Sequence, residues 1–401
     1  MNDTGSSMDN ETRPAPKKTP FALRIFAVIC ILIGVQALYA AFISSAAVIV
    51  AAVNGVSITA SGLMSVQALV LWVMLFVLDV ALAALNIAFG IRILAGRLRW
   101  ASRLALAMLF VDIPACVVGM MVVGVISFSF IFHFCIAICL IALHIYLDPT
   151  LVQERREYRR QQKLQNRADQ LDGTLGRDKT GKGYIKLNFF NLFWIFLLAS
   201  FLGWLFEMIV CPFLNGCIQD RTGLLWGPFS PIYGVGATLM TMALNRIYNK
   251  NPLLIFLVSA VVGAGVEFGV SFIFEYAFGI FQWNYENGFL NLQGRTDLFH
   301  AICWGVMGVI FIRWTLPLCL KVINRIPWNW RYALTLVVAV LMFVDFGMTM
   351  LSFDFWYLRS SDTDREDTAM AQFYDENFGN DFMAEHFPYM GMYPKHAVRI
   401  H

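Results

Sequence analysis

The chain has 401 residues, of which 58% are hydrophobic and 14% are charged, and its formal net charge is only +3. A soluble domain is usually about 45–50% apolar and about 25% charged. The apolar excess is gathered in runs of about 20 residues, the length that crosses the hydrocarbon core of a bilayer. The composition therefore excludes a soluble globular protein and predicts an all-α, polytopic helical membrane protein in the lipid bilayer, with no nucleic-acid partner.

The first half predicts a polar tail and four spans. We expect residues 1–20 to be a disordered cytoplasmic tail, because they are polar and contain several prolines. The apolar run that follows is too long for a cleavable signal peptide. We expect spans at residues 21–53, 66–94, 104–125 and 127–147, which together form a four-helix membrane domain over residues 21–147.

A charged linker, residues 148–186, follows the fourth span. It begins at Asp148-Pro149, where proline ends the helix, and it contains ten Lys or Arg residues. We expect its first part to be an amphipathic helix on the membrane surface, attracted by anionic lipid.

The second half predicts five spans, at residues 187–210, 228–244, 253–280, 298–318 and 332–351. They form a five-helix membrane domain over residues 187–351, so we expect about nine transmembrane helices in all. An acidic polar tail, residues 352–401, closes the chain with nine Asp or Glu and four Lys or Arg residues.

The basic residues predict the orientation, because loops rich in Lys and Arg stay in the cytoplasm. A cytoplasmic N-terminus places every basic cluster inside: residues 97–103, the linker, residues 246–250 and residues 321–331. Residues 54–62, 211–227 and 281–295 then lie outside, and after nine spans so does the acidic tail.

Polar residues inside the first four spans favour a packing role. They are Asp79, Asn86, Asp112, His133 and His144. We interpret them as interhelical hydrogen bonds, with one alternative: Asp112 precedes Pro114 by two residues and could cap a broken helix. The two histidines form a poor metal site, so we expect no metal.

The second half carries its polar residues in blocks. Glu267, Ser271 and Glu275 are four residues apart and therefore share one face of an apolar helix. Carboxylates are costly in hydrocarbon and are usually paired or functional there. Residues 221–237 contain Gly227, Pro228 and Pro231, and they predict an irregular, partly re-entrant loop packed on the bundle.

We predict a candidate intramembrane polar site from the charges of these blocks, namely Glu207, Arg221, Glu267, Glu275, Arg295 and His300. Arg–carboxylate pairing would lower the cost of burial. In sequence, Arg295 is the expected partner of the two glutamates of the stripe, and Arg221 that of Glu207. Three interpretations stay open: an ion-pair network that locks helices, a proton- or substrate-linked site near the outer face, and side chains that extend to the membrane surface.

Most of the eight cysteines lie in apolar runs and are expected to be buried thiols. Cys211 and Cys217 flank a short loop instead. A disulfide between them is one alternative if that loop is extracytoplasmic.

Over residues 187–321 the chain resembles a bacterial membrane-protein family, the putative ABC-transporter type IV family of permeases. The resemblance rests on GWLFE, GLLWGPFSPIYGVG, the spacing of Glu267 and Glu275, Trp283-x-Tyr285 and NLQGR…WGVMG. The matching motif positions are Gly203, Trp204, Gly227, Pro228, Pro231, Tyr233, Gly234, Trp283, Tyr285, Gly294, Trp304 and Gly305. The chain departs from the family at Asn284, where aspartate is usual, and at His300.

The resemblance implies a transport permease, or a permease-like subunit, in the bacterial plasma membrane. The sequence has no G-x-x-x-x-G-K-[ST] motif, so an ATPase would be a separate subunit. The alternative is a non-transporting scaffold or sensor that binds envelope proteins. A membrane enzyme that uses Glu275, Arg295 and His300 on a lipid-linked substrate has less support, and we expect no catalytic residues and no cofactor. Homo-oligomerisation stays open.

Overall fold

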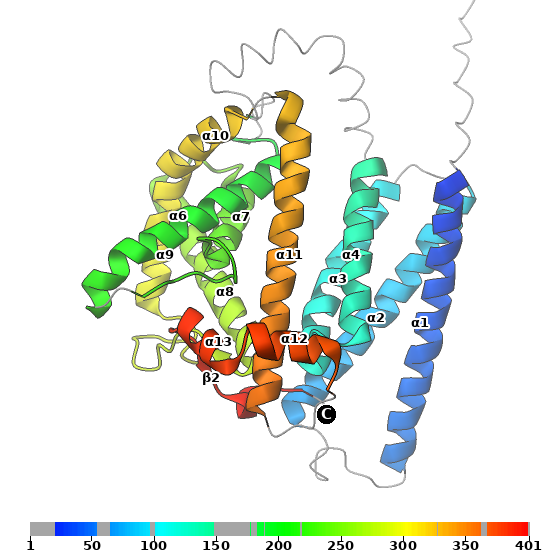
Figure 1. Cartoon of the computed structure of the whole chain (residues 1–401). Coiled ribbons are helices and arrows are strands. Elements are labelled where there is room, and N and C mark those ends of the chain that lie inside the picture. Colours follow the sequence, from blue (N-terminus) through cyan, green and yellow to red (C-terminus); the bar gives the residue numbers. More distant parts are fainter. Residues whose placement is uncertain are drawn as a thin grey trace, which may run out of the picture. The chain divides into compact units, whose positions relative to one another are not determined.

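The computed structural model describes residues 21–53, 65–96, 101–147, 177, 183–187, 189–216, 219–326, 328–361 and 367–399. Within these ranges the chain consists of helices, loops and one pair of two-residue strands (Figure 1). Seven described helices are long and apolar enough to cross a membrane, and two shorter helices are also apolar. The all-α, polytopic class is therefore confirmed, while the count of nine spans stays a prediction.

The chain divides into two compact units. The first contains residues 1–56, 76–115 and 135–152, and the second contains residues 57–75, 116–134 and 153–401. The predicted domain boundaries are not tested by this division. The N-terminal tail and most of the linker lie outside the described residues.

The first half of the chain forms four helices. They are α1 (Phe21–Val53), α2 (Val66–Leu94), α3 (Ala101–Val123) and α4 (Phe128–Leu147). In the first unit, α1 and α2 approach closely where a Cβ on Gly34 would lie only 2.7 Å from the backbone oxygen of Ala83. Small residues permit such close packing of membrane helices.

The hypothesis that Asp112 caps a broken helix is wrong. Helix α3 runs through Asp112 and Pro114 without interruption. Membrane helices tolerate proline where neighbouring groups satisfy the freed carbonyl. Asn86 donates to the Leu82 carbonyl at 3.0 Å, so this bond lies within its own helix and does not join two helices.

The second half contains the remaining elements. The first group is α6 (Phe189–Asn215), α7 (Pro231–Leu244), α8 (Pro252–Phe278) and strand β1 (Ile280–Phe281). Helix α9 (Leu298–Ile310), the π-helical turn η1 (Phe311–Thr315) and α10 (Leu316–Asn324) follow one another directly. The last group is α11 (Trp328–Ser360), α12 (Ala369–Asn377), α13 (Asn380–His386), strand β2 (Gly391–Met392) and the 3-10 turn η2 (Pro394–His396).

Glycines set the spacing of α6, α7, α8 and α9. A Cβ on Gly203 would overlap the Tyr233 ring, and a Cβ on Gly263 would overlap Trp304. Each large ring therefore occupies the space beside a glycine of the neighbouring helix. Helix α7 has 14 residues and is about 21 Å long, which is less than the core of a bilayer.

Residues 367–399, called the C-terminal cap below, are folded. Helices α12 and α13 lie across the end of α11 (Figure 1), and β2 pairs antiparallel with β1. The first residues of the predicted acidic tail instead extend α11 to Ser360. Arg399 near the end of the cap pairs with Asp354 of α11, whose side chain is 1% exposed.

Asp354 joins three segments of the second unit. Besides Arg399, it accepts hydrogen bonds from the backbone amides of Val125 and Ile126, each at 3.1 Å. The turn between α3 and α4, the end of α11 and the cap therefore meet at one buried carboxylate.

Candidate functional site

The polar stripe of α8 is buried in the protein. Glu267, Ser271 and Glu275 are 6%, 2% and 9% exposed. Such burial requires partners for both carboxylates. The two glutamates, however, have partners of different chemistry.

Glu275 forms an ion pair with Arg295, the partner expected from the sequence. Both side chains are nearly buried, at 11% and 8% exposure. The guanidinium also lies 5.5–5.7 Å from the ring centroids of Phe272 and Tyr276 on α8 and donates to Gln293 at 2.7 Å. This arrangement fastens the loop after β1 to α8 by charge and by cation–π contact.

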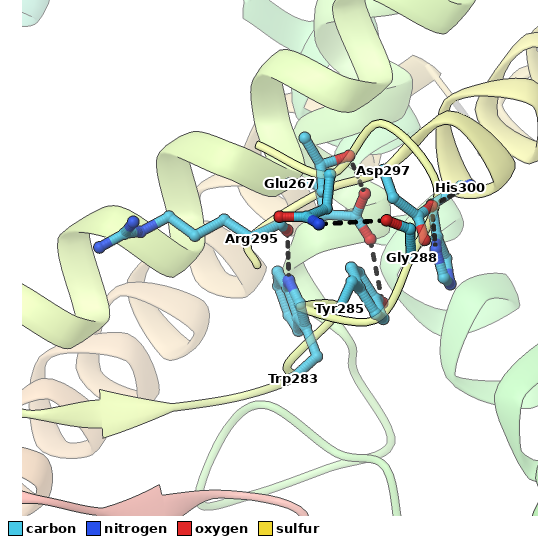
Figure 2. A network of polar contacts seen from close by, with 9 residues as sticks. Glu267, Trp283, Tyr285, Gly288, Arg295, Asp297 and His300 are labelled. Carbon is cyan, nitrogen blue, oxygen red and sulfur yellow. Dashed lines mark hydrogen bonds and ion pairs between the residues drawn. The ribbon is translucent and has the colours of Figure 1, made fainter. Parts of the chain in front are cut away.

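Glu267 is held by hydroxyl groups. Its Oε1 accepts from the Tyr285 hydroxyl at 3.2 Å, and its Oε2 accepts from Thr296 Oγ1 at 2.8 Å. Figure 2 shows the side chain of Arg295 pointing away from Glu267. In the part of the chain that the structure describes, no Lys or Arg pairs with Glu267. The expectation that Arg295 serves both glutamates is therefore wrong, because its guanidinium reaches only Glu275.

Tyr285 stays a hydrogen-bond donor at this site. Burial, together with the negative charge of Glu267, raises the pKa of its phenol. Its ring stacks on the imidazole of His300, with centroids 3.8 Å apart and planes 15° apart. Tyr285 of the loop and His300 of α9 thus form an aromatic pair, of which Tyr285 contacts the Glu267 carboxylate (Figure 2).

Asp297 orients His300. It is the N-cap of α9, accepting from the His300 backbone amide at 2.8 Å, and it contacts His300 Nδ1 at 2.7 Å. Burial acts to raise the pKa of Asp297, but the hydrogen bonds and charge of His300 outweigh it, so the pKa is lowered. The imidazole is 31% exposed. One of its faces therefore contacts Tyr285 of the loop, and part of the ring is open to solvent.

The shape of the loop after β1 depends on a few contacts. Trp283 Nε1 donates to the Arg295 backbone oxygen at 2.7 Å (Figure 2). Gly294 has φ +68°, a conformation that side chains rarely adopt. Gly288 lies against Asp297, where a Cβ would overlap the carboxylate. These positions explain why this loop needs glycine and tryptophan at fixed places.

Glu207 and Arg221 form a second, looser pair. Arg221 Nε lies 4.0 Å from Glu207 Oε2, with side chains 19% and 28% exposed. Tyr233 of α7 hydrogen-bonds to Glu207 and also experiences the charge of Glu267. Tyr233 therefore lies near both carboxylates. Arg221 also donates to Cys211 Sγ at 3.5 Å.

The predicted disulfide is not tested. Cys217 lies outside the described residues, and Cys211 is buried.

Polar groups in the loop of residues 219–230 are hydrogen-bonded to other protein groups. An irregular segment within a membrane protein requires this, because lipid offers no hydrogen bonds. Trp204 Nε1 donates to Asp220 at 3.0 Å, and Gly227 has φ +78°. The amides of Leu225 and Trp226 donate to Thr349 and Asp345 of α11, at 3.0 and 3.2 Å. Pro228 lies in this loop, and Pro231 opens α7, where proline is well tolerated.

The remaining motif positions act in packing. A Cβ on Gly234 would overlap Ser200, and one on Gly305 would lie 2.6 Å from the Phe256 ring. Trp304, 8% exposed, lies against Gly236 and Gly263 and has its ring 5.8 Å from that of Tyr233. The motif residues thus pack around Tyr233 and hold its ring near Glu207.

Several residues of this region were not singled out in the sequence. Thr296 and Asp297 come from the loop, while Asp345 and Asp354 are carboxylates in an apolar helix. The last two carried the same signal as the α8 glutamates, an acid within a hydrophobic run. Thr296 carried none, because a lone threonine in a loop is ordinary.

Three observations bear on the other predicted residues. Among the described residues no group of three or more His, Cys, Asp or Glu could hold a metal ion. Asp112 and His133 are buried in α3 and α4. The side chain of His144 lies outside the described ones.

Comparison with known proteins identifies one family. Residues 194–350 match the family described as Putative ABC-transporter type IV. The resemblance expected over residues 187–321 is thereby confirmed, and the match continues into α11. Neither a curated protein nor a solved structure matches the chain. The chain is thus a multi-pass membrane protein with a region of putative transporter type.

Proposed function

We propose that the chain is the membrane subunit of an ABC-type transporter, with the pathway in residues 189–360 and the ATPase on a separate chain. The family match over residues 194–350 and the long apolar helices support this role. A separate ATPase follows from the sequence, which has no Walker A motif. On this proposal the protein is not itself an enzyme.

The observation that carries the proposal is the difference between Glu267 and Glu275. The charge of Glu275 is neutralised by Arg295, which suits a structural ion pair that holds α8 and the loop after β1 together. Glu267 has only the hydroxyls of Tyr285 and Thr296 among its described hydrogen-bond partners. A buried carboxylate held by neutral donors can exchange a proton or a cationic group without breaking an ion pair. Intramembrane carboxylates of this kind mark transport pathways.

The surroundings of Glu267 fit a pathway. Tyr233 lies near both Glu267 and Glu207, and Arg221 Nε lies 4.0 Å from the Glu207 carboxylate. His300 is partly exposed above Tyr285. The surroundings of Glu267 thus contain a second carboxyl group, Glu207, and an imidazole, His300, and both are partly exposed.

We propose that this site faces the outer side of the plasma membrane. The basic loops support a cytoplasmic N-terminus and linker, and this places the loop after β1 and the C-terminal cap outside. The cap contacts the end of α8 that follows Glu275: the Tyr393 amide donates to the Gly279 backbone oxygen at 2.7 Å. The ATPase would then bind at the opposite end of the bundle, on the cytoplasmic side to which the basic residues of the sequence assign the linker.

A non-transporting scaffold is the second candidate. The folded C-terminal cap favours it, because a rigid extracytoplasmic surface can bind envelope proteins. The two candidates differ in what the protein retains when it is purified.

The test is purification of the tagged full chain from its own membranes in a mild detergent. We expect a stoichiometric subunit that carries a Walker A motif and hydrolyses ATP. Recovery of envelope proteins without such a subunit would refute the transporter proposal and favour the scaffold.

The role of Glu267 is tested in the same complex after reconstitution into vesicles. We expect Glu267→Gln to change the ATPase rate at least about threefold, since the pathway residue loses its charge. Glu286→Gln, an exposed glutamate of the same outer loop, is the matched control and should leave the rate unchanged. A wild-type rate in Glu267→Gln would remove Glu267 from the pathway.

A further inference from the structure

Helix α11 changes its surroundings along its length. Its middle carries exposed apolar side chains, with Leu336 66%, Leu341 63% and Phe346 43% exposed. Its last turns are enclosed, with Phe353 0% and Trp356 5% exposed. Apolar side chains exposed on a membrane-spanning helix face lipid, so the lipid-facing surface of α11 ends near Phe346 and protein covers the helix beyond it.

The C-terminal cap supplies that cover. The Tyr374 ring stacks on Phe355 with centroids 4.8 Å apart, and its hydroxyl contacts Met348 Sδ at 3.0 Å. Arg359 donates to Asp375 at 2.9 Å and so ties α12 to α11. Helix α12 therefore crosses α11 beyond Phe346, through contacts that run from Met348 to Arg359, where the lipid-facing surface of α11 has ended (Figure 1).

An exposed apolar surface, called the aromatic rim below, runs along the cap at this level. Its exposed members are Trp226 (49%), Met370 (49%), Phe373 (45%) and Phe382 (39%). The rings of Trp226, Phe373 and Phe382 all lie within 6.3 Å of the ring of Phe378, which is buried beneath them. The Trp226 amide donates to Asp345, which places the Trp226 end of the rim beside Phe346 of α11.

We propose that the aromatic rim is a lipid-binding surface that lies in the interfacial layer of the bilayer, with its rings against the glycerol and upper acyl-chain region. Aromatic rings are enriched at this depth, and amphipathic helices lie there parallel to the membrane plane. The rim continues the lipid-facing surface of α11 at the same level, which favours lipid over a protein partner. The cap anchors the outer end of α11 in this way.

Charge predicts which lipid chemistry the rim takes. The segment Ala369–Met392 contains Asp375, Glu376, Asp381 and Glu385 and no Lys or Arg. Anionic headgroups would be repelled by these carboxylates. The rim should therefore bind zwitterionic phospholipid through apolar contact.

The test replaces single residues of α12 in the full chain with the photoreactive amino acid benzoylphenylalanine. Phe373 is the rim position, and Gln372 is the matched control: it is also exposed, but it points about 100° away around the helix. Each variant is placed in nanodiscs of palmitoyl-oleoyl phosphatidylcholine, illuminated and analysed by mass spectrometry. We expect a phosphatidylcholine adduct at position 373 in at least about fivefold higher yield than at position 372.

Equal yields at the two positions, or no lipid adduct at position 373, would overturn the proposal. A protein adduct in place of lipid, when the position 373 variant is illuminated in native membranes, would also overturn it and would indicate a protein partner. If the position 373 variant does not fold, position 382 gives the same readout on α13. None of these outcomes depends on transport.

Discussion

The contrast between the two glutamates of α8 can be tested by stability alone. Glu275→Gln leaves Arg295 in a site where its side chain is 8% exposed, and its Nε already has no hydrogen-bond partner among the described residues. Removing one partner of a buried ion pair costs about 3–5 kcal/mol, because the other charge stays buried. Glu267→Gln keeps an acceptor for Tyr285 or Thr296, and such a membrane hydrogen bond is worth about 0.6–1.7 kcal/mol.

These magnitudes give a measurable difference. In a domain of this size about 1 kcal/mol shifts the melting temperature by about 2–4 °C. Glu275→Gln should therefore lower the apparent melting temperature by about 6–20 °C, and Glu267→Gln by about 1–7 °C.

The assay is thermal unfolding in detergent with a thiol-reactive dye. The buried thiols of Cys211 and Cys319 become accessible only on unfolding. The double variant Glu275→Gln with Arg295→Gln should recover part of the loss, since it removes the unpaired charge. Glu286→Gln is the surface control.

Two results would refute the reasoning. If Glu267→Gln were as destabilising as Glu275→Gln, the assignment of one residue to the lock and the other to the pathway would fail. If the double variant recovered nothing, the cost would not come from an unpaired arginine.

Three further predictions concern the residues around the site. Arg399→Gln should speed proteolysis of the cap at least about tenfold, because Asp354 loses its partner, and unchanged cleavage would contradict the joint described for that carboxylate. Asp297 has a lowered pKa, so its stabilisation is present above the unfolded value of about 3.9 and is lost as pH falls through the folded pKa. Asp297→Asn should therefore lower the melting temperature at pH 7 but flatten its decline in acid, and identical pH profiles for the two proteins would count against this. Gly263→Leu should cost more than about 2 kcal/mol by displacing Trp304, whereas the same change at an open glycine, Gly265, should cost far less.

The helical architecture could be predicted because hydrophobic length is a local property. Each of the described long helices begins within a few residues of the predicted span, and α2 coincides with it at Val66–Leu94. Proline and glycine marked the irregular loop before α7 for the same reason, since backbone restrictions act locally. The cap was missed, because residues 352–401 were interpreted as a polar tail from their acidic residues. The apolar residues among them pack against α11, and β2 pairs with β1, which are contacts between segments distant in sequence.

The sequence by itself determined that this is a helical membrane protein, that its second half resembles the matched family, and that acids on α8 share one face. The 3.6-residue period and the cost of charge in hydrocarbon are enough for the first and the last of these conclusions. Only the tertiary structure decided that Arg295 serves Glu275 while Tyr285 and Thr296 hold Glu267. Which glutamate pairs with Arg295 depends on where the loop after β1 returns to α8. Pairing with Glu275 and pairing with Glu267 differ only in the direction of the Arg295 side chain. Composition and spacing do not encode that direction.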